Sequence, residues 1–324
     1  MKGRSREIAV AGTILALFAV LAWRAPGYFS RANLSDLFLA NVPVLIVALG
    51  MTLVILTGEI DISVGSIFAI AGIASGEFAK MGLPVLAAGL AACFAGAAMG
   101  AVNGALVAYL RVPSIVVTLA AMVGLRDGLR WATQGAWVDN LPAGFQWLGL
   151  SQSAYPSMVL LVAVALTASF AWGLQNIAAG RAVYATGSNP EAARLLGIHP
   201  SRVKFSVFTI LGGLTALAAV LNSVRFNQIP SNAGLGLEMK VIAAVVIGGT
   251  AITGGKGSTL GTVFGVILMG AIGPALTFLS VGSYWEKSIQ GAIILAAILI
   301  DAVGIHLDKR RLEIDGNGLI SNRA

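Results

Sequence analysis

Runs of apolar residues, each long enough to cross a bilayer, follow one another along most of the chain. A spanning helix needs about 20 mostly apolar residues, because the hydrocarbon offers no water to bind backbone N–H and C=O groups. We therefore expect ten spans, over residues 8–22, 37–57, 63–79, 83–110, 113–131, 157–177, 205–222, 239–253, 258–280 and 288–305. Hydrophobic residues make up 57% of the chain and charged residues 11%. The sequence predicts an all-α integral membrane protein with about ten transmembrane helices.

The distribution of basic residues predicts the topology. Counted over alternate loops, 13 of the 21 Lys and Arg residues fall on the side that holds both termini. Since cytoplasmic loops carry the excess of Lys and Arg, we expect both termini to be cytoplasmic. The net charge of +7 is then a topology signal, and no basic stripe indicates nucleic acid. No linker divides the chain, so we expect one transmembrane domain over residues 1–324.

Small residues recur every four positions in two places, which gives a helix a flat face that a second backbone can approach. The rows are Gly96, Gly100 and Gly104, flanked by Ala92 and Ala108, and then Gly257, Gly261 and Gly265. Both rows predict tight helix packing and say nothing about a substrate. Asn103, beside the first row, is expected to form an interhelical hydrogen bond.

Two segments resemble each other within the chain. TGEIDISVGSIFA, residues 57–69, aligns without gaps on TGGKGSTLGTVFG, residues 253–265. Both join a helix that enters the cytoplasm to one that leaves it, which would make a parallel repeat of the kind found in some transporters. Chance similarity between two glycine-rich turns explains the match equally well.

The segment over residues 178–204 is polar and predicted to be cytoplasmic. Asn189 is a good N-cap, Pro190 suits the first helical position, Glu191 favours the positive first turn, and Gly197 can close the helix in the left-handed conformation. These residues predict a helix of about two turns outside the bilayer. An exposed helix this short is marginal alone, so we expect it to dock on another protein.

The pattern Glu191-Ala192-Ala193-x-x-x-Gly197 resembles the EAA motif of bacterial ABC importer permeases, the coupling helix that fits a groove on the ATP-binding subunit. The strings TGEIDISVGS, YATGSNPEAARLLGI and GLEMKVIAAVVIGGTAITGGKGS look like those of the ribose, rhamnose and autoinducer-2 type of sugar permease. The resemblance implies that Glu191 and Arg194 make polar contacts with the ATPase. It also implies that Ala192, Ala193 and Gly197 allow close approach and a sharp helix end.

This resemblance implies a permease subunit that imports a sugar or sugar-like solute through the inner membrane. ATP and magnesium would be bound by a separate ATP-binding subunit, so no cofactor is expected here. The other implied partners are a second permease subunit, identical or a paralogue, and a periplasmic binding protein. Import of branched-chain amino acids is the alternative substrate class, because the permeases for those solutes have a related architecture.

Two acids, Glu59 and Asp61, lie between the second and third spans. We expect Glu59 to be in a solvated turn, and either Asp61 or Ser63 to cap the third span. The alternative is that Asp61, Ser63 and Gly65 mark the turn where the pathway opens and hydrogen-bond a hydroxyl-rich solute. Later in the chain, Glu238 and Lys240 are expected to pair with each other, and Lys204 to be a cytoplasmic anchor.

Other function classes lack their motifs. GGTAITGGKGST, residues 248–259, is a near miss to a Walker A loop, with Gly257 where Ser or Thr would hold magnesium. The only two histidines, His199 and His306, predict no metal site. A carrier driven by an ion gradient would need acids at mid-depth, and Glu77 is the nearest to one. That class is the remaining alternative, and no enzymatic activity is expected.

Overall fold

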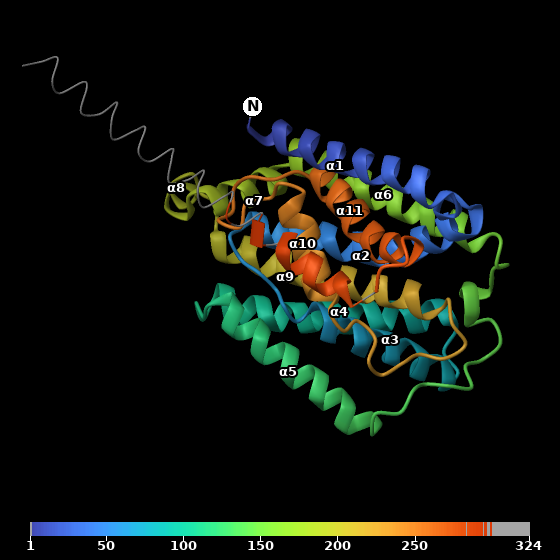
Figure 1. Cartoon of the computed structure of the whole chain (residues 1–324). Coiled ribbons are helices and arrows are strands. Elements are labelled where there is room, and N and C mark those ends of the chain that lie inside the picture. The colour runs from blue at the N-terminus through green and yellow to red at the C-terminus, as the bar shows by residue number, and fades with distance from the viewer. Residues whose placement is uncertain (1, 283, 294, 297–298, 300–324) are drawn as a thin grey trace, which may run out of the picture.

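The computed structural model describes residues 2–282, 284–293, 295–296 and 299, with side chains from residue 7 (Figure 1). Its helices are α1 Lys2–Arg24, α2 Arg31–Leu56, α3 Val64–Lys80, α4 Val85–Ala108, α5 Ser114–Thr133, α6 Tyr155–Asn176, α7 Ala178–Ser188, α8 Pro190–Leu195, α9 Pro200–Ser223, α10 Leu237–Ile247 and α11 Thr259–Phe278. Two short 3-10 helices, η1 Pro26–Phe29 and η2 Gln146–Gly149, and a helix over 285–293 complete the set. In this part of the chain the fold is all-helical, as the sequence predicts.

Six helices are long and apolar enough to cross a membrane: α1, α2, α4, α6, α9 and α11. The predicted spans at α3, α5 and α10 are shorter or more polar, and the last one, 288–305, extends beyond the described residues together with the C-terminus and His306. The count of ten spans therefore remains a prediction.

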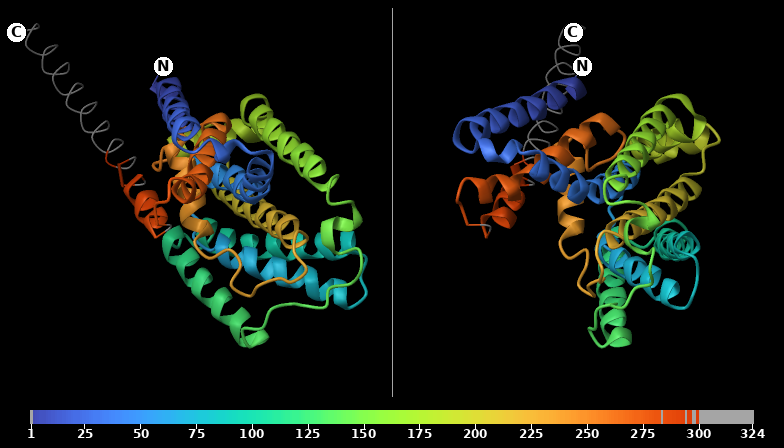
Figure 2. Two further views of the ribbon diagram at one scale, coloured as in Figure 1. Left: turned by 45° about the vertical axis from the view of Figure 1, so that its right-hand side comes forward. Right: turned by 90° about the vertical axis from the view of Figure 1, so that its right-hand side faces the viewer.

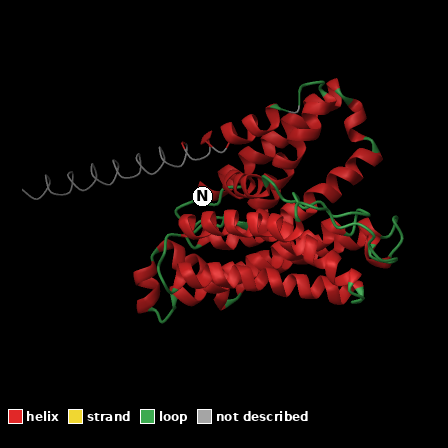
Figure 3. Cartoon of the chain, turned by 90° about the horizontal axis from the view of Figure 1, so that it is seen from below, coloured by secondary structure: helices red, strands yellow, loops and turns green. Residues whose placement is uncertain are grey.

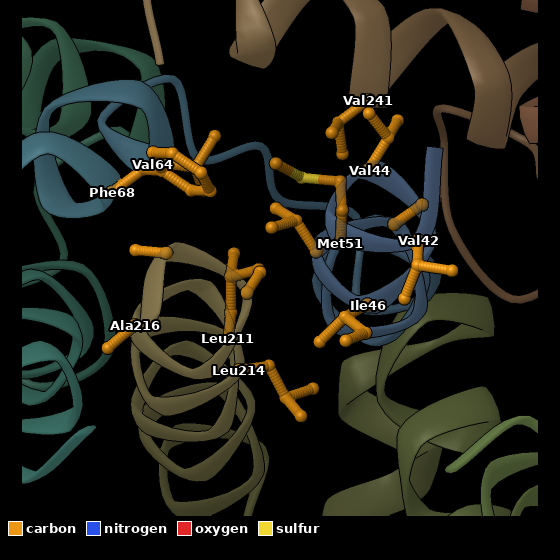
Figure 4. Packing of buried hydrophobic residues seen from close by; sticks show 14 of the residues in the cluster. Val42, Val44, Ile46, Met51, Val64, Phe68, Leu211, Leu214, Ala216 and Val241 are labelled. Carbon is orange, nitrogen blue, oxygen red and sulfur yellow. The ribbon is translucent and has the colours of Figure 1, made fainter. Parts of the chain in front are cut away.

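The helices lie roughly side by side, with α2 at the centre (Figure 2). In the apolar stretch of 18 residues that would cross the membrane, 83% of the residues of α2 are buried, whereas 17% of those of α1 are buried. Met51 of α2, Leu211 of α9 and Phe68 of α3 point toward one another, and Val241 approaches from α10 (Figure 4). Since lipid is as apolar as these side chains, close van der Waals packing rather than escape from water stabilises such contacts.

Both glycine rows lie where two helices come into close contact. Gly96, Gly100 and Gly104 of α4 face Ala216, Gly212 and Phe208 of α9, and Gly261 and Gly265 of α11 face Gly248 and Ala244. A methyl group on any of these row glycines would overlap the neighbouring backbone or side chain. Gly257 precedes α11 and packs on the side chain of Thr250.

Two connections are irregular yet enter the bundle. We call residues 57–63 the α2–α3 junction and residues 248–258 the α10–α11 junction. The helices beside them, α3 and α10, have only 17 and 11 residues. The long loops between α5 and α6 and between α9 and α10 gather at the other end of the bundle, away from α7 and α8 (Figures 1 and 3). There Val138 and Ile229 form an isolated antiparallel bridge.

Candidate functional site

Helix α8 has the two caps that the sequence predicts. The Asn189 side chain accepts hydrogen bonds from the backbone N–H groups of Glu191 and Ala192, both at 3.0 Å. At the other end Gly197 has φ of 79°, its N–H donates to the Arg194 carbonyl at 2.9 Å, and the next residue donates to the Ala193 carbonyl at 3.0 Å. These two bonds form a Schellman motif, which closes the helix after two turns.

The outer surface of α8 is unusually apolar for so short a helix. Leu195 is 90% exposed and Leu196 79% exposed, while Ala193 is buried against the protein. Arg194 and Glu191 form an exposed ion pair at 2.9 Å. With no atom within 4 Å of a methyl group built on Gly197, the end of α8 is open to close approach by another surface.

Helix α7, directly before α8, was not predicted from the sequence. It anchors the coupling segment, residues 178–204, to the end of α2 and to the α10–α11 junction. The Tyr184 hydroxyl donates to the Gly257 carbonyl at 2.9 Å, and Gly187 packs directly on the Leu56 carbonyl. That same carbonyl accepts from the Gly255 N–H at 2.9 Å. The end of α2, the end of α7 and the α10–α11 junction therefore meet at one point.

The prediction of a solvated Glu59 was wrong. Its side chain is 15% exposed and forms an ion pair with Lys204, which is 23% exposed and lies in the first turns of α9. Lys204 is therefore a contact residue rather than a free cytoplasmic anchor. Separating a largely buried ion pair would leave each charge uncompensated, which costs free energy. This pair therefore fixes the α2–α3 junction to α9.

Asp61 is completely buried, and the capping prediction was wrong for Ser63. Asp61 Oδ1 accepts from the backbone N–H of Ser63 at 2.8 Å and from its hydroxyl at 2.6 Å, and the Ser63 Oγ accepts from Asn103 of α4 at 2.9 Å. Asp61 thus binds the amide directly before α3, whereas the Ser63 side chain caps no amide of α3. Burial raises the pKa of the Asp61 carboxyl, an effect that the bonds from Ser63 oppose. The buried acid of this region is thus Asp61, whereas Glu77 is 41% exposed and pairs with Lys80 at 3.3 Å.

Gly65 lies next to a buried arginine. Arg126 of α5 is 8% exposed and donates to the carbonyls of Gly65 at 2.7 Å and Ala233 at 2.8 Å. The Glu238 carboxylate packs on Gly65, where a methyl group would overlap it. Glu238 therefore faces α3 and acts on the charge of Arg126. The acid that acts on the charge of Lys240 is Glu286. The predicted pair of Glu238 with Lys240 is therefore not formed.

The structure contains a cavity of about 830 Å³ that was not predicted from the sequence. It lies between α2, α3, the last turn of α9, the start of α10 and the 285–293 helix. Its lining includes Phe68, Asn222, Lys240, Glu286, Lys287 and Gln290. These residues come from separate segments, so no local motif could reveal the cavity. In the sequence, the one sign of it was the pair of charged residues, Glu286 and Lys287, directly before the last predicted span.

The chain matches known permeases over most of its length. Residues 33–298 match the family described as "Branched-chain amino acid transport system / permease component". The chain belongs to this permease family. It is 35% identical, over 92% of its length and 85% of the relative, to the autoinducer 2 import system permease protein LsrC of Yersinia pseudotuberculosis. It is also 35% identical, over 89% of its length and 91% of the relative, to the ribose import permease protein RbsC of Escherichia coli K12.

Membership of this family makes the chain a multi-pass membrane protein with a transport role. No solved structure matches it. The comparisons assign no residue, so the roles of α8, the α2–α3 junction and the cavity rest on the geometry described above.

Proposed function

We propose that this chain is the membrane-spanning permease subunit of an ATP-driven importer that carries a sugar or sugar-like solute across the bacterial inner membrane. The names of its relatives, ribose and autoinducer 2 import permeases, support this substrate class. The chain would act beside a second permease subunit, with ATP and magnesium bound by an ATP-binding subunit. A periplasmic binding protein would deliver the solute, and both termini would lie in the cytoplasm.

The exposed end of α8 is the observation that carries the proposal. A capped helix that presents Leu195 and Leu196 to water gains about 1.5–3 kcal/mol for each leucine that a partner buries. Glu191 and Arg194 would then exchange their mutual ion pair for contacts with the ATPase. The stop at Gly197 lets the partner surface approach the helix end. These features suit a coupling helix seated in a groove.

When the ATPase moves α8, the contacts of α7 would carry that movement into the membrane-spanning part of the chain. A displacement of α8 would be passed through α7 to the Leu56 carbonyl, where both junctions meet. The ion pair between Glu59 and Lys204 links the same region to α9. The two junctions would therefore move as one unit when the ATPase closes.

For Asp61, Ser63 and Gly65 we keep the proposal of a turn on the translocation path, in a modified form. Asp61 and Ser63 are fully buried, so they could reach a solute only after the α2–α3 junction has moved. The hydrogen bond from Asn103 to Ser63 would hold the junction closed until then.

Import of a branched-chain amino acid remains the second candidate, because the matching family is described by that substrate. The two relatives above, which cover about nine tenths of the chain, favour the sugar class. A carrier driven by an ion gradient is not supported by either of these relatives.

Affinity purification of the tagged protein from native membranes, followed by mass spectrometry of bound proteins, tests the coupling role. We expect an ATP-binding subunit with the wild type, and its loss in Leu195→Asp and in a variant changed at both Glu191 and Gly197. Leu110→Asp is a matched control, because Leu110 is 68% exposed in the α4–α5 turn. Recovery of the ATPase with every variant would remove α8 from the coupling role. Recovery of the wild type alone, in detergent that preserves other such complexes, would contradict the importer itself.

A further inference from the structure

The cavity of about 830 Å³ lies at the end of α9 opposite the coupling segment. Asn222, in the last turn of α9, is one wall, and residues 234–240 are another. Its size lies within the range of about 300–1,000 Å³ that is usual for small-molecule sites.

Polar groups converge on this cavity from different segments. The Gln290 amide donates to Glu286 Oε1 at 3.0 Å, and Lys240 of α10 lines the same cavity within the electrostatic influence of Glu286. Glu286 is also pressed against α11, where a methyl group on Gly273 would lie 2.7 Å from Oε2. The carboxylate is therefore held in place by the surrounding helices.

Other residues of the lining are apolar. They include Phe68 of α3, Pro43 and Val44 of α2 and Leu237 of α10. The cavity thus combines hydrogen-bonding groups with aromatic and aliphatic side chains. A sugar has matching features, because its hydroxyls point outward around the ring edge while its C–H groups form an apolar face.

We propose that this cavity binds the transported solute, a neutral polyhydroxylated molecule, through Asn222, Lys240, Glu286 and Gln290, with Phe68 against the face of its ring. The inference rests on the proposed function and adds the location and the chemistry of the binding site. These residues supply hydrogen-bond donors and acceptors, and Lys287 leaves the lining with one net positive charge. Such a lining favours the hydroxyl groups of a sugar over the apolar side chain of leucine, and it disfavours a solute that is itself a cation.

Solute protection of an introduced cysteine tests the proposal directly. Cys93 is the one cysteine of the chain, so Cys93→Ala provides a background for Leu235→Cys, assembled with its ATPase and binding protein; Leu235 lines the cavity, is 59% exposed and is not one of the proposed solute contacts. A membrane-impermeant maleimide is added from outside, with ribose or leucine as probe. We expect labelling to slow about tenfold at ribose concentrations about ten times the dissociation constant, because only unoccupied protein reacts. Leucine should leave the rate unchanged.

Gln152→Cys in the same background is the matched control. Gln152 is exposed in the loop before α6 and lies outside the cavity, so neither probe should change its labelling. Adding Glu286→Gln, which keeps the side-chain shape, should weaken ribose protection of Leu235→Cys at least several-fold. Equal protection with and without Glu286→Gln would overturn the role of that carboxylate.

Uptake separates a failure of this site from a failure of the proposed function. If wild-type protein takes up ribose in an ATP-dependent way but ribose never protects Leu235→Cys, the cavity is not the solute site. If leucine is taken up and protects while ribose does neither, the sugar assignment fails together with the hydroxyl chemistry. If neither probe is taken up, the proposed function fails, and the inference fails with it.

Discussion

The two junctions have similar sequences and similar places in the fold, yet they hold irregular backbone inside the bundle by different means. In the α2–α3 junction, side chains provide the partners: Asp61 accepts both donors of Ser63, which in turn accepts from Asn103. In the α10–α11 junction the backbone provides partners within the segment itself, since Gly254 donates to the Ala251 carbonyl at 2.9 Å and Ala251 to the Lys256 carbonyl at 2.8 Å, and Tyr184 of α7 adds a bond from outside it. Every buried polar backbone group needs a partner, and the two segments meet this requirement with different residues.

The comparison also bears on their common origin. Helix α3 begins at Val64 and α11 at Thr259, and in the alignment of the two segments Val64 matches Leu260, one position later. The two hydroxyls of Thr52 in α2 and Thr262 in α11 meet at 2.7 Å, so the segments belong to one contact region. Whether they descend from one ancestral repeat stays a prediction.

The largest effect is expected where the junctions meet α7. Gly187→Ala would place a methyl group on the Leu56 carbonyl, and a backbone atom cannot move aside as a side chain can. We expect a loss of at least about 3 kcal/mol of stability and a collapse of transport. Thermal unfolding in detergent checks this. Gly128→Ala in α5, with nothing within 4 Å, is the control and should unfold at or above the wild-type temperature. Equal behaviour of the two variants would mean that α7 does not press on α2.

A smaller effect is expected from removing the side chain that holds the α2–α3 junction. Asp61→Ala leaves both the N–H and the hydroxyl of Ser63 without their acceptor, at a cost of about 2 kcal/mol. Asp61→Asn keeps an acceptor oxygen and should unfold near the wild-type temperature. The measurement is the midpoint of thermal unfolding for all three proteins. If Asp61→Ala is as stable as Asp61→Asn, side chains do not hold this junction.

The smallest effect is expected in the α10–α11 junction. Thr250 is fully buried, and its hydroxyl has no hydrogen-bond partner among the described residues. Thr250→Val has the same shape without the hydroxyl, so stability should stay within about 0.5 kcal/mol of the wild type or rise. Thr52→Val is the matched control, because its hydroxyl contacts the Ala48 carbonyl and Thr262 Oγ1, both at 2.7 Å, and should cost about 1 kcal/mol. A large loss in Thr250→Val would show that the Thr250 hydroxyl also holds this junction.

Several features of the chain were decided by the sequence alone, because each depends on residues close together along it. The membrane class follows from apolar runs, the caps of α8 from Asn189 and Gly197, and the close helix contacts from glycines at a spacing of four. Helix α7 was missed for the converse reason: it contains Gly180, Thr186 and Gly187, which are poor helix formers. Contacts with the junctions, including the Tyr184 hydrogen bond, stabilise it instead.

Only the tertiary structure decided what the charged residues do. Glu59 and its partner Lys204 are 145 positions apart, and Lys240 lies on a different helix from Glu286, the acid that acts on its charge. The spacing of charged residues along the sequence could predict neither relation. The same holds for the cavity, whose walls come from segments far apart in the sequence. A charge inside a membrane bundle takes whichever partner the helix packing brings within reach, and that packing depends on the whole chain.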